Sequence, residues 1–133
     1  MLKGSCLCKA VRYEIEGKLD GARHCHCSMC RKAHGAAFRS RARVRSDDFR
    51  WLAGAELITW YESSPGTQRG FCSRCGSPLL SRFAADPTIY GLPLGCLDTD
   101  PGVKPVMHIF VASKAPWFEI TDTLPRYPEG PPR

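Results

Sequence analysis

Three cysteines with metal-binding spacing occur in the short segment "HCHCSMCRKAHG" at 24–35. Cys25, Cys27 and Cys30 follow a C-x-C-x-x-C pattern, which lets three thiolates reach one metal ion from a single loop and helical turn. A structural zinc has four protein ligands, whereas a catalytic zinc keeps one position for water or substrate. The segment therefore predicts a metal site whose fourth ligand decides whether it is structural or catalytic.

The histidines of the same segment are the candidates for that fourth ligand. His24 and His26 alternate with the cysteines, so they point the other way if the segment is extended. His34 lies four residues after Cys30 and comes within reach of the metal on a helix. His34 is therefore the main competitor of water or substrate.

A second cysteine pair occurs in "FCSRCGS", where C-x-x-C is followed by glycine, as in a zinc knuckle. Cys72 and Cys75 supply two ligands, and Cys6 and Cys8 of "GSCLC" can supply the other two of a closed site. Such a site stabilises the fold by joining distant parts of the chain. A thioredoxin-like redox pair is the alternative, but it needs a βαβ context that this sequence lacks.

Length and composition indicate one globular domain, which we place at residues 1–125, followed by a loosely ordered proline-rich tail at 126–133. The chain contains eight cysteines but no signal-type segment at its start and no apolar run long enough to span a membrane. We therefore expect a cytoplasmic protein with reduced thiols rather than four disulfides. Cys96 stands apart from the clusters and is interpreted as a small buried residue.

The formal charge of +6 raises the question of a nucleic-acid partner. Seven thiolates would remove seven charges and two zinc ions would restore four, which leaves about +3. The basic stretch "FRSRARVRSDDFR" alternates arginine with other residues and is interpreted as a solvated strand face. We therefore do not expect a nucleic-acid partner.

Short runs of β-branched and aromatic residues between glycines and prolines predict a mostly β fold. In "CKAVRYEIEG", Val11, Tyr13 and Ile15 fall on one face and Glu14 on the other. Cys6 and Cys8 then lie off the hydrophobic face, unless a turn after Gly4 changes the phase. Further strands are predicted within 37–44, 57–63, 70–83, 88–97 and 106–112. The best helix candidate is 27–35, closed by a glycine.

Three segments in this order, "GSCLCKAVRYE", "CHCSMCRKAHGAAF" and "GFCSRCGSPL", resemble the glutathione-dependent formaldehyde-activating enzyme family, which also contains centromere protein V. The later segments "LGCLDTD" and "HIFVASKAPWFEI" resemble the same family. The resemblance implies several coiled, mostly antiparallel β-sheets, called a β-tent, with zinc joining them and little helix. It also implies two zinc ions: a structural one on Cys6, Cys8, Cys72 and Cys75, and a catalytic one on Cys25, Cys27 and Cys30.

The family's reaction joins glutathione to formaldehyde and gives S-(hydroxymethyl)glutathione, so the resemblance implies a carbon–sulfur lyase with a small thiol and a carbonyl compound as substrates. Arg31 and Lys32 directly follow the third cysteine and either bind substrate carboxylates or form a solvated turn. His26 and His34 are the nearest candidates for the proton donor. The alternatives are a zinc-stabilised binding module for protein or nucleic acid, and zinc storage or redox sensing.

Overall fold

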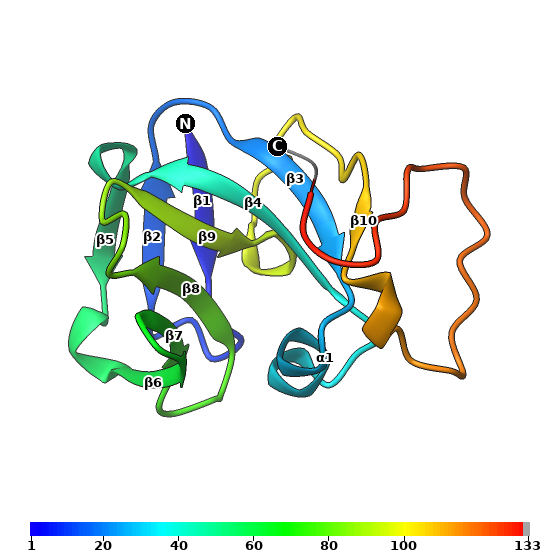
Figure 1. The fold of residues 1–133 in the computed structure, drawn as a ribbon. Helices are drawn as coiled ribbons and strands as arrows, with labels where there is room; N and C mark the ends of the chain where they lie inside the picture. Colours follow the sequence, from blue (N-terminus) through cyan, green and yellow to red (C-terminus); the bar gives the residue numbers. More distant parts are fainter. Residues whose placement is uncertain (132–133) are drawn as a thin grey trace.

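Strands dominate the computed structural model, which describes residues 1–131 (Figure 1). The helix is α1 (Ser28–His34). The strands are β1 (Leu2–Ser5), β2 (Arg12–Ile15), β3 (Asp20–Cys25), β4 (Arg39–Arg45), β5 (Phe49–Ala53), β6 (Ile58–Ser64), β7 (Thr67–Cys72), β8 (Pro78–Phe83), β9 (Ile89–Pro93) and β10 (His108–Ile109). The predicted fold class, mostly β with little helix, is confirmed.

Two sheets organise these strands. The small sheet has the order β1-β2-β5, and the large sheet has the order β10-β3-β4-β9-β8-β7-β6. All pairs are antiparallel except β10 with β3, which run parallel. In Figure 1, α1 lies at the bottom of the molecule, directly after β3 and before β4. The antiparallel arrangement predicted from the sequence is therefore confirmed, apart from this short parallel pair.

The hydrophobic face predicted for the first strand is the centre of the main core. Val11, Tyr13 and Ile15 are fully buried, as expected. Glu14 was expected on the solvent side but is only 7% exposed, because it pairs with Arg50 of the neighbouring strand β5. A buried carboxylate needs such a partner to offset its lost hydration.

A turn after Gly4 interrupts the alternation of side chains between the two strand faces, so Cys6 and Cys8 do not continue the pattern of β2. Residues 6–11 form the connection between β1 and β2, and the backbone N–H of Cys6 donates to the carbonyl of Val11 at 3.0 Å. Lys9 in the turn has a φ of 64°. Cys6 and Cys8 therefore project from a hairpin turn rather than from a strand face.

The short helix α1 begins and ends within the predicted segment. The thiol of Cys27 caps its N-terminus by accepting from the N–H of Cys30 at 3.3 Å. Gly35 ends the helix in the left-handed conformation, with φ 57°. This geometry places the middle cysteine of the C-x-C-x-x-C motif at the helix cap and the last one inside the helix.

The arginine-rich strand β4 differs from its prediction. Arg43 and Arg45 are exposed, but Arg39 is only 4% exposed and Arg41 is half-buried. β4 lies between β3 and β9 in the large sheet. The expectation of a solvated face is therefore wrong for the N-terminal half of this strand, which neighbouring elements cover.

The proline-rich tail is docked, whereas the sequence favoured loose order. Tyr127 N–H donates to the carbonyl of His108 at 2.9 Å, and Phe110 N–H donates to the carbonyl of Glu129 at 2.8 Å. Residues 132 and 133 of the predicted tail lie outside the described residues. The division into a domain at 1–125 and a tail at 126–133 stays a prediction. Within residues 1–131, no helix combines the length and the apolar character needed to cross a bilayer.

Candidate functional site

Two turns from distant parts of the chain bring four thiols together. Cys6 and Cys8 lie in the turn after β1, and Cys72 and Cys75 lie at the turn between β7 and β8. Their sulfur atoms all lie within 4.8 Å of one another. The Cys6–Cys8 separation is 3.5 Å and the Cys8–Cys72 separation is 3.8 Å. These distances exceed a disulfide bond of about 2.05 Å, and all eight cysteines are free.

The local backbone turns N–H and O–H donors toward these sulfurs. Val11 N–H donates to the sulfur of Cys6 at 3.3 Å, and the Ser77 hydroxyl lies 3.3 Å from the sulfur of Cys75. Gly76 adopts φ 80° and donates its N–H to the carbonyl of Cys72 at 2.8 Å, a conformation that glycine adopts without strain. Four thiolates in such a turn pair match the donor set of a closed tetrahedral zinc site.

The second group contains the three cysteines of the C-x-C-x-x-C motif. Cys25 ends β3, Cys27 caps α1 and Cys30 lies in its first turn. Their sulfur atoms also lie within 4.8 Å of one another, and within residues 1–131 no histidine nitrogen, carboxylate oxygen or further thiol belongs to the group. Three soft thiolate donors suit zinc and leave one coordination position for a ligand from outside the chain.

Close packing of these thiols perturbs their protonation. The pKa of Cys30 is lowered because first Cys25 and then Cys27 hydrogen-bond to its thiolate, with a smaller contribution from Arg69. The pKa of Cys25 is raised, chiefly by Cys27 and then by Cys30. Three thiols this close share protons unless a cation compensates their charges. The donor set therefore fits a metal ion.

Cys96 belongs to neither group. Its sulfur donates to the carbonyl of Pro78 at 3.2 Å, and it lies half-buried in the 3-10 turn Leu94–Cys96. The interpretation of Cys96 as a small buried residue is therefore only partly met, because the turn leaves it half-buried.

A hydrogen-bonded chain of side chains lies behind the three-thiol group. His26 Nε2 is 2.8 Å from His108 Nδ1, and His108 Nε2 is 2.9 Å from a carboxylate oxygen of Asp122. His26 and His108 are almost fully buried. Burial lowers the pKa of His26 to about 4, with His108 adding to the effect, so this imidazole is neutral near pH 7. These hydrogen bonds join the loop after β3 to the C-terminal segment.

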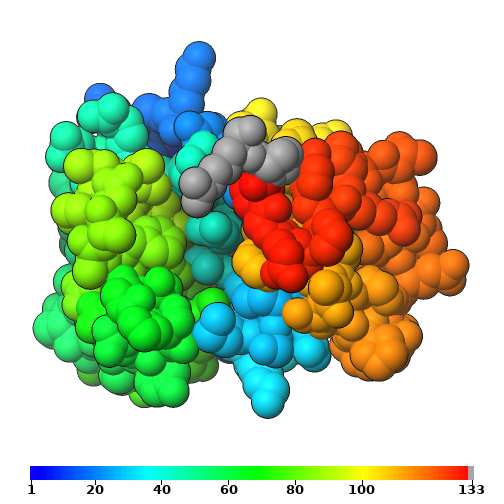
Figure 2. Space-filling model, viewed as in Figure 1, coloured from blue at the N-terminus to red at the C-terminus, as the bar shows by residue number. Residues whose placement is uncertain are grey.

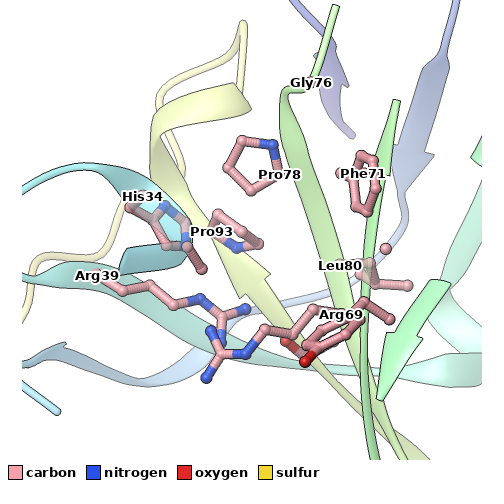
Figure 3. Close-up of a pocket in the computed structure, with 12 residues that line it drawn as sticks. His34, Arg39, Arg69, Phe71, Gly76, Pro78, Leu80 and Pro93 are labelled. Carbon is pink, nitrogen blue, oxygen red and sulfur yellow. The ribbon is translucent and has the colours of Figure 1, made fainter. Parts of the chain in front are cut away.

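A cavity of about 250 Å³ lies between α1 and the strands β4, β7, β8 and β9 (Figure 3). Pro78, Leu80 and Pro93 supply apolar wall, and His34 lines the cavity from the end of α1. Arg39 and Arg69 both line one side of it (Figure 3), and the charge of Arg69 contributes to lowering the pKa of Arg39. The cavity adjoins the three-thiol group, because Arg69 Nη2 lies 3.6 Å from the sulfur of Cys30.

The four predicted substrate and proton-transfer residues are not all brought to this cavity. His34 lines it, and burial lowers its pKa to about 4, with the charge of Arg39 as the next cause. Lys32 lines an adjoining hollow of about 390 Å³ that shares Arg69 with the cavity. Arg31 is half-buried and lines neither space, and His26 is turned toward His108.

Figure 2 shows the α1 region, in cyan, between the β6–β7 hairpin, in green, and the segment after β10, in orange. Four residues at this site were not predicted from the sequence: Arg39 and Arg69, which line the cavity, and His108 and Asp122, which form the hydrogen-bonded chain with His26. A polar histidine inside the apolar run "VMHIFVA" was the available signal for one of them. Arg39 carried no such signal, because alternating arginines are typical of an exposed strand. Arg69 stands alone in "TQRGFC", where nothing in the local pattern marks it.

Comparisons with known proteins agree with this architecture. The family model described as "Glutathione-dependent formaldehyde-activating enzyme" matches residues 1–113. A Halomonas elongata protein whose name provisionally assigns it to the glutathione-dependent formaldehyde-activating enzymes is 31% identical over 128 residues, which cover 90% of this chain and 81% of that protein. A Podospora anserina protein with the same name is 32% identical over 89 residues, which cover 65% of this chain and 42% of that protein.

A solved structure is similar as well. The crystal structure of a Rhodobacter sphaeroides protein matches with a TM-score of 0.63 and 34% identity, covering 77% of this chain and 97% of that one. This chain thus combines two mainly antiparallel sheets and two thiol groups with a sequence match to the family over most of its length. The chain belongs to the glutathione-dependent formaldehyde-activating enzyme family.

Proposed function

We propose that this protein is a zinc-dependent carbon–sulfur lyase that adds a small carbonyl compound to the thiol of glutathione, or removes it. Family membership supports the reaction class. The observation that carries the proposal is the group of Cys25, Cys27 and Cys30, which includes no fourth ligand atom from residues 1–131 and adjoins a cavity. A closed structural site would have a fourth protein ligand.

Two zinc ions per chain fit the two donor sets. Cys6, Cys8, Cys72 and Cys75 would hold the structural ion, and the three remaining clustered thiols would hold the catalytic one. Zinc bound at the three thiolates supplies a Lewis acid that favours the thiolate form of glutathione.

The chain's own residues bind and orient the substrates. The hollow beside Lys32 offers a cationic group and the walls of Met29 and Tyr61 to the peptide part of glutathione. Its carboxylates pair with the ammonium of Lys32 there. The cavity that shares Arg69 with this hollow receives the carbonyl compound. Arg31, which lines neither space, contributes positive charge near the thiols but no direct contact.

Proton transfer is assigned to His34 rather than His26. His34 lines the cavity and is neutral near pH 7, so its imidazole can accept the thiol proton and pass it to the carbonyl oxygen. His26 already shares its Nε2 with His108, so it holds the loop between Cys25 and Cys27 in place.

Cobalt substitution tests the open position. The protein is loaded with Co²⁺ in place of zinc and titrated with glutathione while the absorption spectrum is recorded. We expect a new sulfur-to-cobalt charge-transfer band that saturates at one thiol per chain, because the three-thiol site accepts an external ligand. Elemental analysis of the untreated protein should give two zinc ions per chain. The absence of a new band, with four protein ligands on both metals, would make both sites structural and remove the basis for catalysis.

A further inference from the structure

The cavity next to the three-thiol group contains two arginines that lack acidic partners. Arg39 is 4% exposed, and no carboxylate among residues 1–131 forms an ion pair with Arg39 or Arg69. Burial lowers the pKa of Arg39 to about 10, which still leaves the guanidinium charged near pH 7. The thiolates of Cys25 and Cys30 offset part of this positive charge. Three thiolates around a divalent cation would carry a net charge of only about −1, however, so two guanidinium groups leave a positive excess that a further anion would neutralise.

Each of these arginines also has one buried N–H donor without a hydrogen-bond partner among residues 1–131. Arg39 Nη2 donates to the carbonyl of Gly91 at 3.3 Å, but its Nε has no hydrogen-bond partner among the described residues. Arg69 Nε donates to the Ser63 hydroxyl at 3.0 Å, but its Nη1 is buried without a partner. Figure 3 shows both guanidinium groups at the cavity. Two guanidinium groups that line the same cavity suit a carboxylate.

The remaining walls restrict the rest of the ligand. Phe71, Pro78, Leu80 and Pro93 are apolar. His34, Tyr61 and Ser81 also line the cavity and can form hydrogen bonds, but none of them is an acidic, lysine or arginine side chain that would pair with a second charge. The volume of about 250 Å³ is below the roughly 300–1,000 Å³ of sites for drug-sized ligands. The cavity therefore fits a small monocarboxylate with a short apolar or hydrogen substituent.

We propose that the carbonyl substrate of this protein is a small 2-oxo acid, whose carboxylate is bound by Arg39 and Arg69. This inference rests on the proposed function. Arg69 Nη2 lies 3.6 Å from the sulfur of Cys30, so a carboxylate held there lies beside the three-thiol group, where the glutathione sulfur would bind. In a 2-oxo acid the carboxyl carbon is bonded directly to the carbonyl carbon, whereas the carboxylates of glutathione are several bonds from its sulfur. The position thus favours the carbonyl compound as the source of the carboxylate.

The reaction is an addition without oxidation or reduction. The sulfur of glutathione forms a C–S bond to the carbonyl carbon of the acid, the C=O double bond becomes a C–O single bond, and the thiol proton ends on that oxygen. The carboxylate is unchanged. The guanidinium groups also stabilise the negative charge that develops on the oxygen during the addition.

Direct binding of an unreactive analogue tests the carboxylate site separately from catalysis. Oxamate has the shape of a small 2-oxo acid but a poorly electrophilic amide carbon, and oxamide is its neutral counterpart. Isothermal titration calorimetry of the zinc-containing protein should show oxamate binding at least tenfold tighter than oxamide. Arg39→Gln and Arg69→Gln should each weaken oxamate binding roughly tenfold to a hundredfold, because each removes charge-assisted hydrogen bonds.

Arg45→Gln is the matched control, since Arg45 lies exposed on the same strand as Arg39. It should bind oxamate like the unmodified protein. If Arg39→Gln does not fold because the site is buried, the half-buried Arg69 still tests the proposal. Equal binding of oxamate and oxamide, or an equal loss in Arg45→Gln, would overturn it.

Two further experiments decide whether the arginines bind the carboxylate of the carbonyl compound or one of glutathione, and they separate this inference from the proposed function. S-Methylglutathione should leave oxamate binding in place; displacement of oxamate would assign the arginines to the thiol and overturn the inference. Hemithioacetal formation from glutathione is then followed with glyoxylate and with formaldehyde. We expect kcat/KM at least tenfold higher for glyoxylate, with the preference lost in Arg69→Gln. Turnover of formaldehyde without a glyoxylate preference would overturn the inference and leave the proposed function intact, whereas no acceleration with either compound would reject both.

Discussion

The two thiol groups differ in how strongly each cysteine is tied to the rest of the fold. Cys72 is fully buried and packs in the main core, where it joins the β7–β8 turn to the β1–β2 turn. Cys27 is half-buried and acts locally as the cap of a short helix. The same substitution should therefore have different consequences at these two positions.

Cys72→Ser should lower the free energy of unfolding by more than about 3 kcal/mol, because it opens a closed four-thiolate site whose metal binding is coupled to folding. Cys27→Ser should cost less than about 1 kcal/mol, because serine is itself a preferred helix cap, but it should lose the metal of the three-thiol site. Thermal melting and zinc content of both variants provide the measurement. Cys96→Ser is the control and should retain both ions. A lower melting temperature for Cys27→Ser than for Cys72→Ser would reverse the two roles.

The histidine–aspartate chain fixes the C-terminal segment and gives its docking a pH dependence. The hydrogen bond from His108 is the main cause that lowers the pKa of Asp122. A carboxyl whose pKa is lower in the folded state stabilises that state above its unfolded pKa of about 3.9, and the contribution is lost as the pH falls through the folded pKa.

Asp122→Asn should therefore reduce the loss of stability on acidification below about pH 4, since the amide does not titrate. Hydrogen exchange of the His108 and Tyr127 amides, measured against pH, reports the docking of this segment directly. Asp47→Asn is the control, because Asp47 is exposed and touches only Arg45 at 3.9 Å. An unchanged pH profile in Asp122→Asn would show that this carboxylate does not hold the segment.

At the scale of elements, the β1–β2 hairpin carries Cys6 and Cys8 in its turn. Its pairing requires the backbone of Gly4 to lie close to the ring of Tyr13. A Cβ added at Gly4 would lie 2.2 Å from the Tyr13 ring. Tyr13 cannot move away easily, because it is fully buried and stacks on Phe49 with ring centroids 5.1 Å apart. Only glycine lets the two strands pair at this position.

Gly4→Ala should therefore lower the free energy of unfolding by about 1–3 kcal/mol, the usual cost of overpacking a core. Denaturant unfolding measures the change. Gly95→Ala is the matched control, since its new methyl group meets nothing within 4 Å and should have little effect. Equal stability of the two variants would show that Tyr13 yields to the added methyl group.

Elements differed in how well their sequences predicted them. The helix was predicted because Gly35 gives a clear end signal, and β2 because Val11, Tyr13 and Ile15 alternate. β3 was missed because its sequence "DGARHC" has few apolar residues and its pairing with β4 is irregular between Asp20 and Arg23. β5 was missed although "FRWLA" is rich in aromatics, because the sequence analysis took the preceding basic stretch as a single strand.

The residues of the candidate site also differ in how well the sequence predicted them. Cysteine spacing is a local property, so the sequence alone assigned the thiols to two groups, and the fold places each group together. Burial of Arg39 depends on which strands and helix lie against β4, and these come from positions 20–25, 28–34 and 89–93. No local pattern distinguishes this arginine from the exposed Arg43 and Arg45.

At the scale of the whole molecule, the excess of positive charge is not all available to a partner. The chain carries a formal charge of +6, but Arg39 is buried, Arg41 and Arg69 are half-buried, and all three lie near the thiolates of the three-thiol group. Thiolates that hold the two proposed zinc ions would lower the charge further. The surface is therefore less basic than the sequence suggests, which argues against nucleic acid as the partner.

Binding to duplex DNA should accordingly be weak, with a dissociation constant above about 10⁻⁵ M at physiological salt and without sequence preference. Fluorescence anisotropy of a labelled duplex, titrated with the zinc-loaded protein at several salt concentrations, gives both affinity and salt slope. The double variant Arg43→Gln, Arg45→Gln removes exposed charge from β4 and should change the weak binding only slightly. Because each neutralised phosphate steepens the salt slope by about 0.9, a slope near −1 to −2 would match a few incidental contacts. Submicromolar affinity with a slope of about −5 or steeper would instead identify an extended basic interface, and would favour a binding module over a carbon–sulfur lyase.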